Sequence, residues 1–197
     1  KSPLPLPLVQ TALWMSSYYA THLATVWQTI LPSGLTKNRR LTPDKITSNA
    51  PSNRIKKVFT KDQQAALQTI ETMLSGTILL HGITGSGKTL VYIEAAKQAL
   101  KEELSSIILV PEIALTSQLV SEFSKHFSKI ILTHSKQTEA QRHAAWKEII
   151  NSNDPVIVIG PRSALFAPVQ QLGLIVIDEC HEPSFKQEQS PRYSALR

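Results

Sequence analysis

Cysteine and long apolar runs are both scarce in this sequence, and each scarcity excludes a class of protein. Cys180 is the only cysteine among 197 residues, so this chain cannot build a disulfide framework or a zinc site from several cysteines. No stretch of 18 apolar residues without charge occurs, which excludes a membrane-spanning helix. The apolar start carries Pro3, Pro5 and Pro7, which favours an extended loop over the helical core of a signal peptide. We therefore expect a cytoplasmic protein that does not contact a membrane.

Acidic side chains are almost missing from the first 57 residues. That portion holds eight basic side chains and a single acid, Asp44, whereas the whole chain has 21 basic and 15 acidic residues and a net charge of +6. The excess of positive charge therefore lies in the N-terminal portion. Two interpretations stay open, namely a segment that binds a polyanion and a solvated basic linker.

The N-terminal portion has a row of apolar residues at helical spacing. This row predicts a helix over residues 9–31 that is ended by Pro32 and Gly34. Residues 36–57 contain two prolines and few apolar side chains, so we expect a linker there.

Residues 58–197 alternate short apolar runs with helical stretches. The runs are continuous rather than alternating in polarity, as is typical of strands covered by helices on both faces. Strand–helix alternation predicts a parallel, doubly wound α/β sheet. The predicted strands are residues 77–81, 106–110, 130–132, 156–159 and 174–177. Four helices are predicted. The first begins at residue 61, the second covers residues 89–102, the third ends near residue 126, and the fourth covers residues 139–150.

The turn after the first predicted strand matches the complete P-loop pattern, and a helix is predicted directly after it. Its glycines let backbone N–H groups face phosphate oxygens, and the helix N-terminus adds positive potential. Lys88 is expected to reach the β- and γ-phosphates of ATP, and the Thr89 hydroxyl is expected to bind Mg²⁺. The expected nucleotide contacts in this turn are Gly82, Thr84, Gly85, Ser86, Gly87, Lys88 and Thr89.

A second polar motif follows the last predicted strand, as Asp178-Glu179-Cys180-His181. The carboxyl ends of parallel strands form the ligand-binding edge of such a sheet, so these residues and the P-loop should share one crevice. Asp178 is expected to hold the metal, and Glu179 to act as general base toward water. His181 either joins the nucleotide site to a second site or only caps the turn.

Gln63 permits two interpretations. Thr60 and Gln63 have the spacing of a helix capping box, which is structural. A glutamine upstream of a P-loop can also contact the edge of adenine. We expect Gln63 to do both.

Three further positions are candidates for nucleic-acid contact. Residues 184–193 combine Phe185 and Tyr193 with Lys186 and Arg192, a composition that suits base stacking together with phosphate contact but also an ordinary surface loop. Arg162 follows a predicted strand and has the same ambiguity. His134 closes another strand, where it could contact a phosphate or cap the next helix.

Taken together, these motifs resemble the PriA family of bacterial primosomal replication-restart helicases. The resemblance covers nearly all of residues 59–197, and a weaker one covers residues 9–35. Its most specific parts are Arg162-Ser163-Ala164-Leu165-Phe166 and Phe185-Lys186-Gln187, which separate this sequence from DExH helicases in general. Other parts of the resemblance are the P-loop, residues 109–116, His134-Ser135 with Arg142 and Trp146, and residues 178–181.

The resemblance implies an ATP- and Mg²⁺-dependent DNA helicase that unwinds DNA 3′ to 5′ at stalled forks. It implies a RecA-like lobe with a parallel sheet and helices on both faces, preceded by a small helical segment. Pro111, Glu112, Arg162 and residues 184–193 would lie on the DNA side. The implied partners are forked or single-stranded DNA, primosome proteins and single-strand-binding protein, with a monomer in the bacterial cytoplasm.

The sequence also departs from the family pattern. Residues 36–57 are too few for the family's winged-helix domain, and the chain stops before the second lobe, its arginine finger and the zinc-binding cysteines. We expect residues 1–35 to be the remnant of a DNA-binding domain, residues 36–57 a basic linker, and residues 58–197 an incomplete first lobe with little activity alone. The alternatives are another DExH translocase or RNA helicase lobe, and an inactive fragment that only binds DNA.

Overall fold

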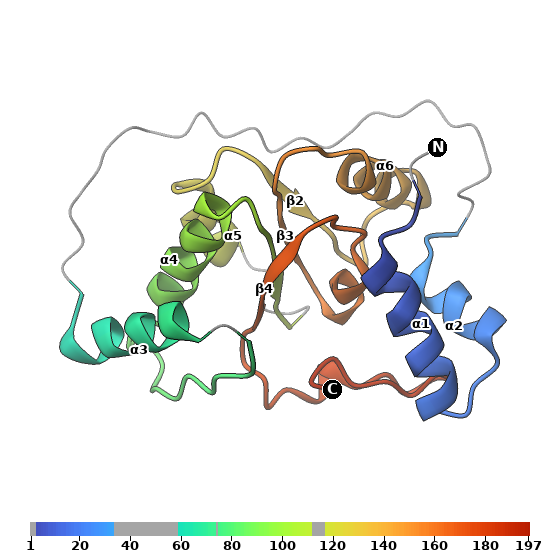
Figure 1. The fold of residues 1–197 in the computed structure, drawn as a ribbon, viewed down its shortest axis with the longest axis horizontal. Helices are drawn as coiled ribbons and strands as arrows, with labels where there is room; N and C mark the ends of the chain where they lie inside the picture. The colour runs from blue at the N-terminus through green and yellow to red at the C-terminus, as the bar shows by residue number, and fades with distance from the viewer. Residues whose placement is uncertain (1–2, 34–58, 74, 112–116) are drawn as a thin grey trace.

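The fold is known from a computed structural model that describes residues 3–33, 59–73, 75–111 and 117–197 (Figure 1). The predicted linker over residues 36–57 and the candidate Glu112 lie outside the described residues. A parallel sheet forms the centre of the molecule, and helices cover both of its faces. The predicted α/β fold of a RecA-like lobe is therefore confirmed.

Four strands make the described sheet, and all of them are parallel to their neighbours. Their spatial order is β2-β3-β1-β4. Since parallel strands run the same way, their carboxyl ends lie along one edge, where ligands bind in such sheets. The strands are β1 (Ser105–Leu109), β2 (Ile130–Leu132), β3 (Ile157–Gly160) and β4 (Leu172–Ile177).

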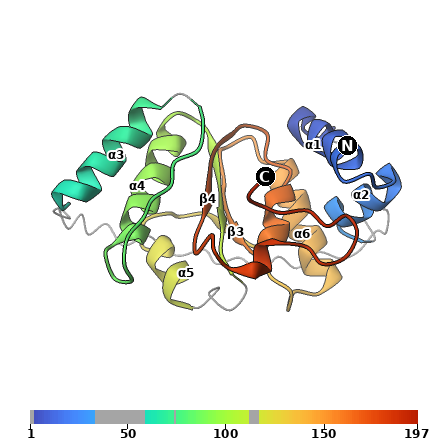
Figure 2. The same ribbon diagram turned by 90° about the horizontal axis from the view of Figure 1, so that it is seen from below.

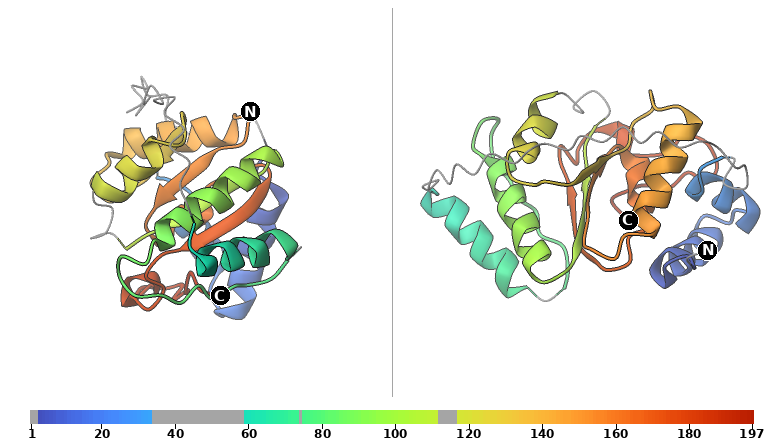
Figure 3. Two further views of the ribbon diagram at one scale, coloured as in Figure 1. Left: turned by 90° about the vertical axis from the view of Figure 1, so that its left-hand side faces the viewer. Right: turned by 90° about the horizontal axis from the view of Figure 1, so that it is seen from above.

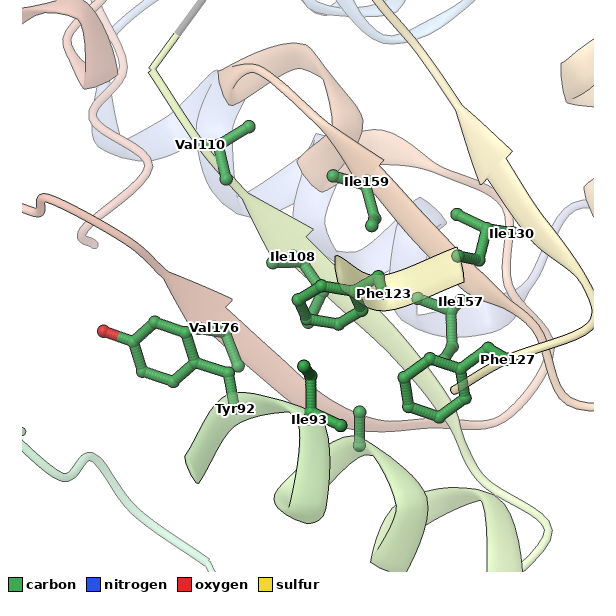
Figure 4. Close-up of a cluster of buried hydrophobic side chains, with 11 residues drawn as sticks. Tyr92, Ile93, Ile108, Val110, Phe123, Phe127, Ile130, Ile157, Ile159 and Val176 are labelled. Carbon is green, nitrogen blue, oxygen red and sulfur yellow. The ribbon is translucent and has the colours of Figure 1, made fainter. Parts of the chain in front are cut away.

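Side-chain alternation along β1 divides the core between the two faces of the sheet. Ile108 and Val110 face α4 (Lys88–Lys101) and α5 (Ser117–Ser124) in one cluster, which Figure 4 shows. Ile107 and Leu109 face the second cluster, which includes side chains of α6 (Glu139–Ile150) and of the 3-10 turn η2 (Arg162–Phe166). The views in Figure 3 show these helices on opposite sides of the sheet. Burial on both faces explains why the strands are continuous apolar runs.

Helix α3 (Lys61–Thr72) lies beside α4 on the outside of the molecule (Figure 1). The predicted capping box begins it. The Thr60 hydroxyl accepts from the Gln63 N–H at 3.3 Å, and the Gln63 Oε1 atom accepts from the Thr60 N–H at 3.0 Å. These reciprocal bonds satisfy two donors that a helix start leaves open.

The N-terminal segment forms two helices rather than the single one predicted over residues 9–31, so that prediction is wrong. They are α1 (Leu6–Tyr18) and α2 (Leu23–Ile30). Ala20 has a positive φ of 46°, which ends helical geometry, and the His22 side chain then caps α2 by accepting from the Ala24 N–H. Helix α1 also starts earlier than predicted, because proline is tolerated in a first turn. Among the described residues, no helix combines the length and apolarity that crossing a bilayer requires.

Helices α1 and α2 pack against the lobe on the α6 side, beyond α6 itself (Figure 2). A third hydrophobic cluster joins the two parts. Full burial of a large apolar side chain contributes about 1.5–3 kcal/mol, so the docking is substantial. The cluster consists of Leu8, Ala12, Met15, Val26 and Ile30 from the helices and Trp146, Phe166 and Tyr193 from the lobe.

Residues 77–81 do not form the strand that their apolar run predicts. Among the described residues, the sheet ends with β4 at one side, and residues 77–81 are not in its ladder. Leu79 is 77% exposed, whereas Leu80 packs against the first core cluster. An apolar run indicates burial of some side chains, but it does not specify a partner strand at the right edge. The P-loop therefore follows an extended segment outside the sheet.

Candidate active site

The P-loop, residues 82–89, connects the extended segment to α4. Gly85 and Gly87 have positive φ angles of 80° and 83°, and Gly87 is the residue that caps α4. Residues with side chains rarely adopt these angles, so glycine is required where the chain curls into the helix. The turn is further closed by the Ser86 N–H, which donates to the Ile83 carbonyl at 3.2 Å. Thr84 is exposed at the outside of this turn, and Thr89 is half-buried in the first turn of α4.

Lys88 folds back over this loop. Its ammonium donates to the Gly82 carbonyl at 2.8 Å and to the Ile83 carbonyl at 3.2 Å. Gly82 is close-packed as well, since a Cβ atom there would lie 2.8 Å from the Ser86 Oγ atom. The lysine charge is thus held against the backbone of the loop, and its contact with phosphates remains a prediction.

Gln63 contacts the P-loop directly. While its Oε1 atom serves the capping box, its Nε2 atom donates to the Ser86 carbonyl at 3.0 Å. The contact is close, because a Cβ atom on Gly87 would lie 2.4 Å from Nε2. In this conformation both ends of the Gln63 amide are engaged, so contact with an adenine edge remains a prediction.

Asp178 lies at the carboxyl end of β4 and is joined to α4. Its Oδ1 atom accepts from the Tyr92 hydroxyl at 3.3 Å and from the Glu179 N–H at 3.1 Å. Burial, with a smaller effect from the Glu179 charge, raises the pKa of Asp178, whereas the nearby Lys88 charge acts to lower that pKa. That Lys88 and Asp178 share one nucleotide site remains a prediction.

Tyr92 was not identified from the sequence, because the P-loop motif ends at Thr89. Burial raises the pKa of the Tyr92 hydroxyl, and the charge of Asp178 adds to this effect. The hydroxyl therefore stays protonated and acts as a donor. Only the structure reveals its link to Asp178, since a tyrosine in an apolar helix face gives no signal of a polar contact.

Glu179 is exposed and has a positive φ of 50°. A left-handed conformation at a residue with a side chain costs about 1–2 kcal/mol, and such strain is often found at functional sites. Its Oε2 atom lies 3.6 Å from the Nδ1 atom of exposed His181. Cys180 lies between them as a half-buried free thiol.

The side chains present fit a nucleotide with a magnesium ion. A hydroxyl oxygen from Thr89 and a carboxylate oxygen from Asp178 are the hard ligands that Mg²⁺ prefers. The lysine and the loop backbone supply positive charge and N–H groups for phosphates. Within the described residues, no group of three or more His, Cys, Asp or Glu side chains forms an all-protein metal cage.

The candidate DNA contacts follow the carboxyl ends of the other strands. Pro111 is buried after β1, His134 is half-buried after β2, and Arg162 begins η2 after β3. His134 belongs to a turn in which its N–H donates to the Gln137 Oε1 atom at 3.3 Å. The parallel sheet therefore brings these residues to the same edge as residues 178–181.

The aromatic side chains of residues 184–193 face inward. Phe185 is 1% exposed and Tyr193 is 4% exposed, whereas Lys186 and Arg192 are exposed. Phe185 belongs to the second core cluster, and Tyr193 contacts Phe166 edge-to-face with ring centroids 5.0 Å apart. Neither ring is available for stacking on a base in this conformation.

Arg162 holds the 184–193 loop in place through hydrogen bonds. Its Nη1 atom donates to the carbonyls of Ser184 at 2.9 Å and Lys186 at 2.5 Å. Burial raises the pKa of Tyr193 to about 12, although the nearby Arg162 charge acts to lower that pKa. The sequence predicted Arg162 as a DNA contact, and the structure additionally gives it an internal role.

The N-terminal helices contact the same C-terminal segment, a link that sequence reasoning missed. The Tyr19 hydroxyl accepts from the Ser194 N–H at 3.2 Å, and the Arg197 guanidinium donates to the Tyr18 hydroxyl. Arg197 also lies over the Tyr18 ring, 5.9 Å from its centroid. Residues 178–197 are therefore held from β4, from Arg162 and from α1.

Comparison with known proteins gives a consistent picture. The DEAD/DEAH box helicase family matches residues 60–196. Replication restart protein PriA of Bacillus subtilis (strain 168) is 42% identical over 142 residues, which cover 70% of this chain and 18% of that protein. PriA of Chlamydia pneumoniae is 46% identical over 135 residues, covering 66% of this chain and 18% of that protein.

A third relative includes the N-terminal helices in its match. PriA of Rickettsia prowazekii (strain Madrid E) is 35% identical over 200 residues, covering 99% of this chain and 30% of that protein. The chain thus spans 18–30% of the length of these curated relatives. It belongs to the DEAD/DEAH box helicase family, and the resemblance to primosomal replication-restart helicases that its sequence predicts is confirmed.

Proposed function

We propose that this chain is the nucleotide-binding lobe of an ATP-dependent DNA helicase that acts in replication restart with 3′ to 5′ polarity. The observation that carries the proposal is the contact between α4 and the residue that follows β4. The Tyr92 hydroxyl on α4, the helix that begins in the P-loop, donates to the Asp178 Oδ1 atom at 3.3 Å. The similarity to three PriA proteins supports DNA rather than RNA as the polymer.

Nucleotide binding is assigned to the P-loop and α4. Backbone N–H groups of residues 82–89 bind the phosphates, and Lys88 leaves the Gly82 and Ile83 carbonyls to contact the β- and γ-phosphates. Thr89 and Asp178 hold Mg²⁺, which when bound neutralises charge on the phosphate oxygens. Gln63 orders the loop through Ser86, and it contacts adenine only if it exchanges one of its present bonds.

Glu179 is assigned as the general base. It accepts a proton from the water that attacks the γ-phosphorus, while the bond to ADP breaks. Its strained backbone and its exposure place the carboxylate beyond β4, on the side that solvent reaches. His181 stays within reach of Glu179 and is assigned to the link with the DNA side.

DNA is proposed to lie along the carboxyl edge of the sheet. Exposed Lys186 and Arg192 supply phosphate contacts, and His134 and Arg162 lie at the ends of neighbouring strands. Stacking by Phe185 or Tyr193 requires the loop to leave its buried position. Primosome proteins and single-strand-binding protein are proposed partners of the longer protein, and residues 1–35 are proposed as part of a DNA-binding domain.

The test is fluorescent mant-ATP binding to the 197-residue chain, with Mg²⁺, for the wild type and Lys88→Ala. Lys97→Ala is the matched control, because Lys97 is also on α4 but pairs with Glu94 at 2.6 Å. We expect binding by the wild type and the control and a loss of at least about tenfold in affinity for Lys88→Ala. Binding that is equal in all three proteins would refute the P-loop assignment.

The polymer is tested in the same assay. Single-stranded DNA should change mant-ATP affinity in the wild type, and an RNA of the same length and base order should change it less. A larger response to RNA would favour an RNA helicase lobe. Binding of fluorescently labelled single-stranded DNA by a chain that does not bind mant-ATP would favour a fragment that only binds DNA.

A further inference from the structure

Tyr92 connects the apolar core to the proposed magnesium site. It lies on α4, three residues after Thr89, so the two side chains are one helical turn apart. Its ring is 9% exposed and belongs to the first core cluster with Ile108, Val110 and Val176. Figure 4 shows the ring beside Val176, with the hydroxyl directed away from the labelled apolar side chains.

The hydroxyl has a defined target beyond that cluster. It donates to the Oδ1 atom of Asp178 at 3.3 Å, and the Glu179 N–H donates to the same Oδ1 atom at 3.1 Å. Two donors from different elements, one on α4 and one after β4, thus converge on one carboxylate oxygen. A carboxylate held at Oδ1 by both has its rotation about the Cβ–Cγ bond restricted, and no described residue donates a hydrogen bond to Oδ2, which can therefore accept another ligand.

We propose that Tyr92 is a positioning residue for Mg²⁺–nucleotide binding: its hydroxyl fixes the Asp178 carboxylate so that Oδ2 serves the metal. This inference rests on the proposed function and adds to it a residue outside the P-loop and the acidic motif. Tyr92 touches neither the nucleotide nor the metal in this scheme and acts only through Asp178.

The core alone does not explain a tyrosine at this position. A phenylalanine ring would fill the same space beside Val176 in the first core cluster, without the cost of bringing a hydroxyl out of water. Buried tyrosines usually direct their hydroxyl to a partner, and the partner here is the proposed metal ligand. The oxygen atom therefore serves the site, whereas the ring serves the core.

The position of Tyr92 also links the two halves of the site mechanically. Lys88, Thr89 and Tyr92 belong to the same rigid helix, and Asp178 ends the neighbouring strand. Any shift of the first turn of α4 when phosphates bind is transmitted to Asp178 through the Tyr92 hydroxyl. The metal ligands on α4 and β4 are thereby kept in register.

The experiment is a Mg²⁺ titration of mant-ATP binding to the 197-residue chain, beginning in EDTA, for the wild type and Tyr92→Phe. We expect the half-saturating Mg²⁺ concentration to rise about three- to tenfold in Tyr92→Phe, which corresponds to the loss of one hydrogen bond to a charged group. The affinity for mant-ATP in EDTA should stay within about twofold of the wild type. A purely structural tyrosine would weaken both kinds of binding or neither.

Tyr19→Phe is the matched control, because it also removes a hydroxyl that forms a hydrogen bond, but at α1 and away from the P-loop. It should leave the Mg²⁺ titration unchanged. In an Asp178→Asn background, Tyr92→Phe should have no further effect on Mg²⁺ dependence. Additive effects in this double-mutant cycle would mean that Tyr92 does not act through Asp178.

The outcomes separate this inference from the proposed function. A wild type that does not bind mant-ATP, or binds it regardless of Lys88, overturns the proposed nucleotide site and the role of Tyr92 with it. A wild type that binds in a Lys88-dependent manner, with the same Mg²⁺ dependence in Tyr92→Phe, overturns only the role of Tyr92. Circular dichroism melting of both variants verifies that the compared proteins are folded.

Discussion

The Nε2 atom of Gln63 donates a hydrogen bond to the Ser86 carbonyl at 3.0 Å, and so ties the start of α3 to the P-loop. Replacing Gln63 by glutamate should preserve the acceptor of the capping box but remove this donor and add a negative charge beside the phosphate site. We expect mant-ATP affinity to fall about tenfold or more, with a melting temperature close to that of the wild type.

The chain offers a matched control for this change. Gln141 forms the same reciprocal capping box with Thr138 at the start of α6, far along the chain from the P-loop. Gln141→Glu should leave nucleotide affinity unchanged. Equal losses in the two variants would show that the effect of Gln63→Glu comes from the helix cap and not from contact with the P-loop.

Asp178 is expected to lower the stability of the lobe while serving the site. Because burial raises its pKa above that of the unfolded chain, its ionised form opposes folding, and stability declines as pH rises through the folded pKa. Asp178→Asn should therefore raise the melting temperature at pH 7, by about 1–3 °C after allowance for solvent screening.

The gain in melting temperature from Asp178→Asn should shrink as the pH is lowered through the raised pKa of Asp178, because the wild-type carboxyl then becomes protonated in the folded state. The half-saturating Mg²⁺ concentration for mant-ATP binding should rise at least about tenfold in this variant at every pH. Thermal melts at several pH values provide the measurement. If Asp178→Asn were less stable than the wild type at neutral pH, the prediction that the ionised Asp178 carboxylate opposes folding would be contradicted.

Glu179 is expected to carry backbone strain, with a φ of 50°. Glu179→Gly should relieve about 1–2 kcal/mol of strain and lose part of this to the greater freedom of glycine in the unfolded chain, for a net gain of about 0.5–1 kcal/mol. Glu179→Gln should leave stability nearly unchanged, since the His181 contact is exposed and contributes little. Urea denaturation measures these differences.

Glu103 supplies the control for backbone strain, because its φ is 60° and it lies after α4, before β1. Glu103→Gly should give a similar gain in stability.

Both Glu179 variants should abolish ATP hydrolysis in a full-length helicase that carries this lobe while retaining nucleotide binding, whereas Glu103→Gly should retain hydrolysis. Hydrolysis that survives in Glu179→Gln would refute its role as general base.

Arg162 is expected to control access to the 184–193 loop. Arg162→Gln removes the charged donor to the Ser184 and Lys186 carbonyls, which should cost about 1–2 kcal/mol locally and let the loop open more often. Limited trypsin digestion should then cut after Lys186 several times faster than in the wild type. Arg142→Gln, at an exposed position on α6, should not change this rate. An unchanged rate in Arg162→Gln would mean that the buried aromatic rings alone hold the loop.

Sequence patterns predicted the lobe well wherever one local signal determined the structure. The capping box of Thr60 and Gln63 placed the start of α3 correctly, and four of the five apolar runs became strands. The fifth run, residues 77–81, did not become a strand. Strand pairing depends on which sheet edge lies nearby, and an apolar run does not specify that edge. The break between α1 and α2 was not predicted, because an alanine with a positive φ angle leaves no signal in the sequence.

The candidate site was predictable in its motifs but not in its connections. The P-loop and residues 178–181 have fixed spacings imposed by their chemistry, so they are recognisable from the sequence alone. The contacts of Tyr92 with Asp178 and of Arg162 with the loop join residues far apart in the chain and have no local pattern. Likewise, the composition of residues 184–193 indicates stacking rings but not that both rings are buried.

The bond between Tyr19 and Ser194 has a consequence for synthesis of the chain. These residues are 175 positions apart, so α1 and α2 emerge from the ribosome long before the segment that completes their docking site. At about 5–20 residues per second, the wait is roughly 9–35 s. During that time the apolar side chains of α1 and α2 lack Trp146, Phe166 and Tyr193 as partners. Within this chain, α1 and α2 are therefore made before the lobe residues against which they dock.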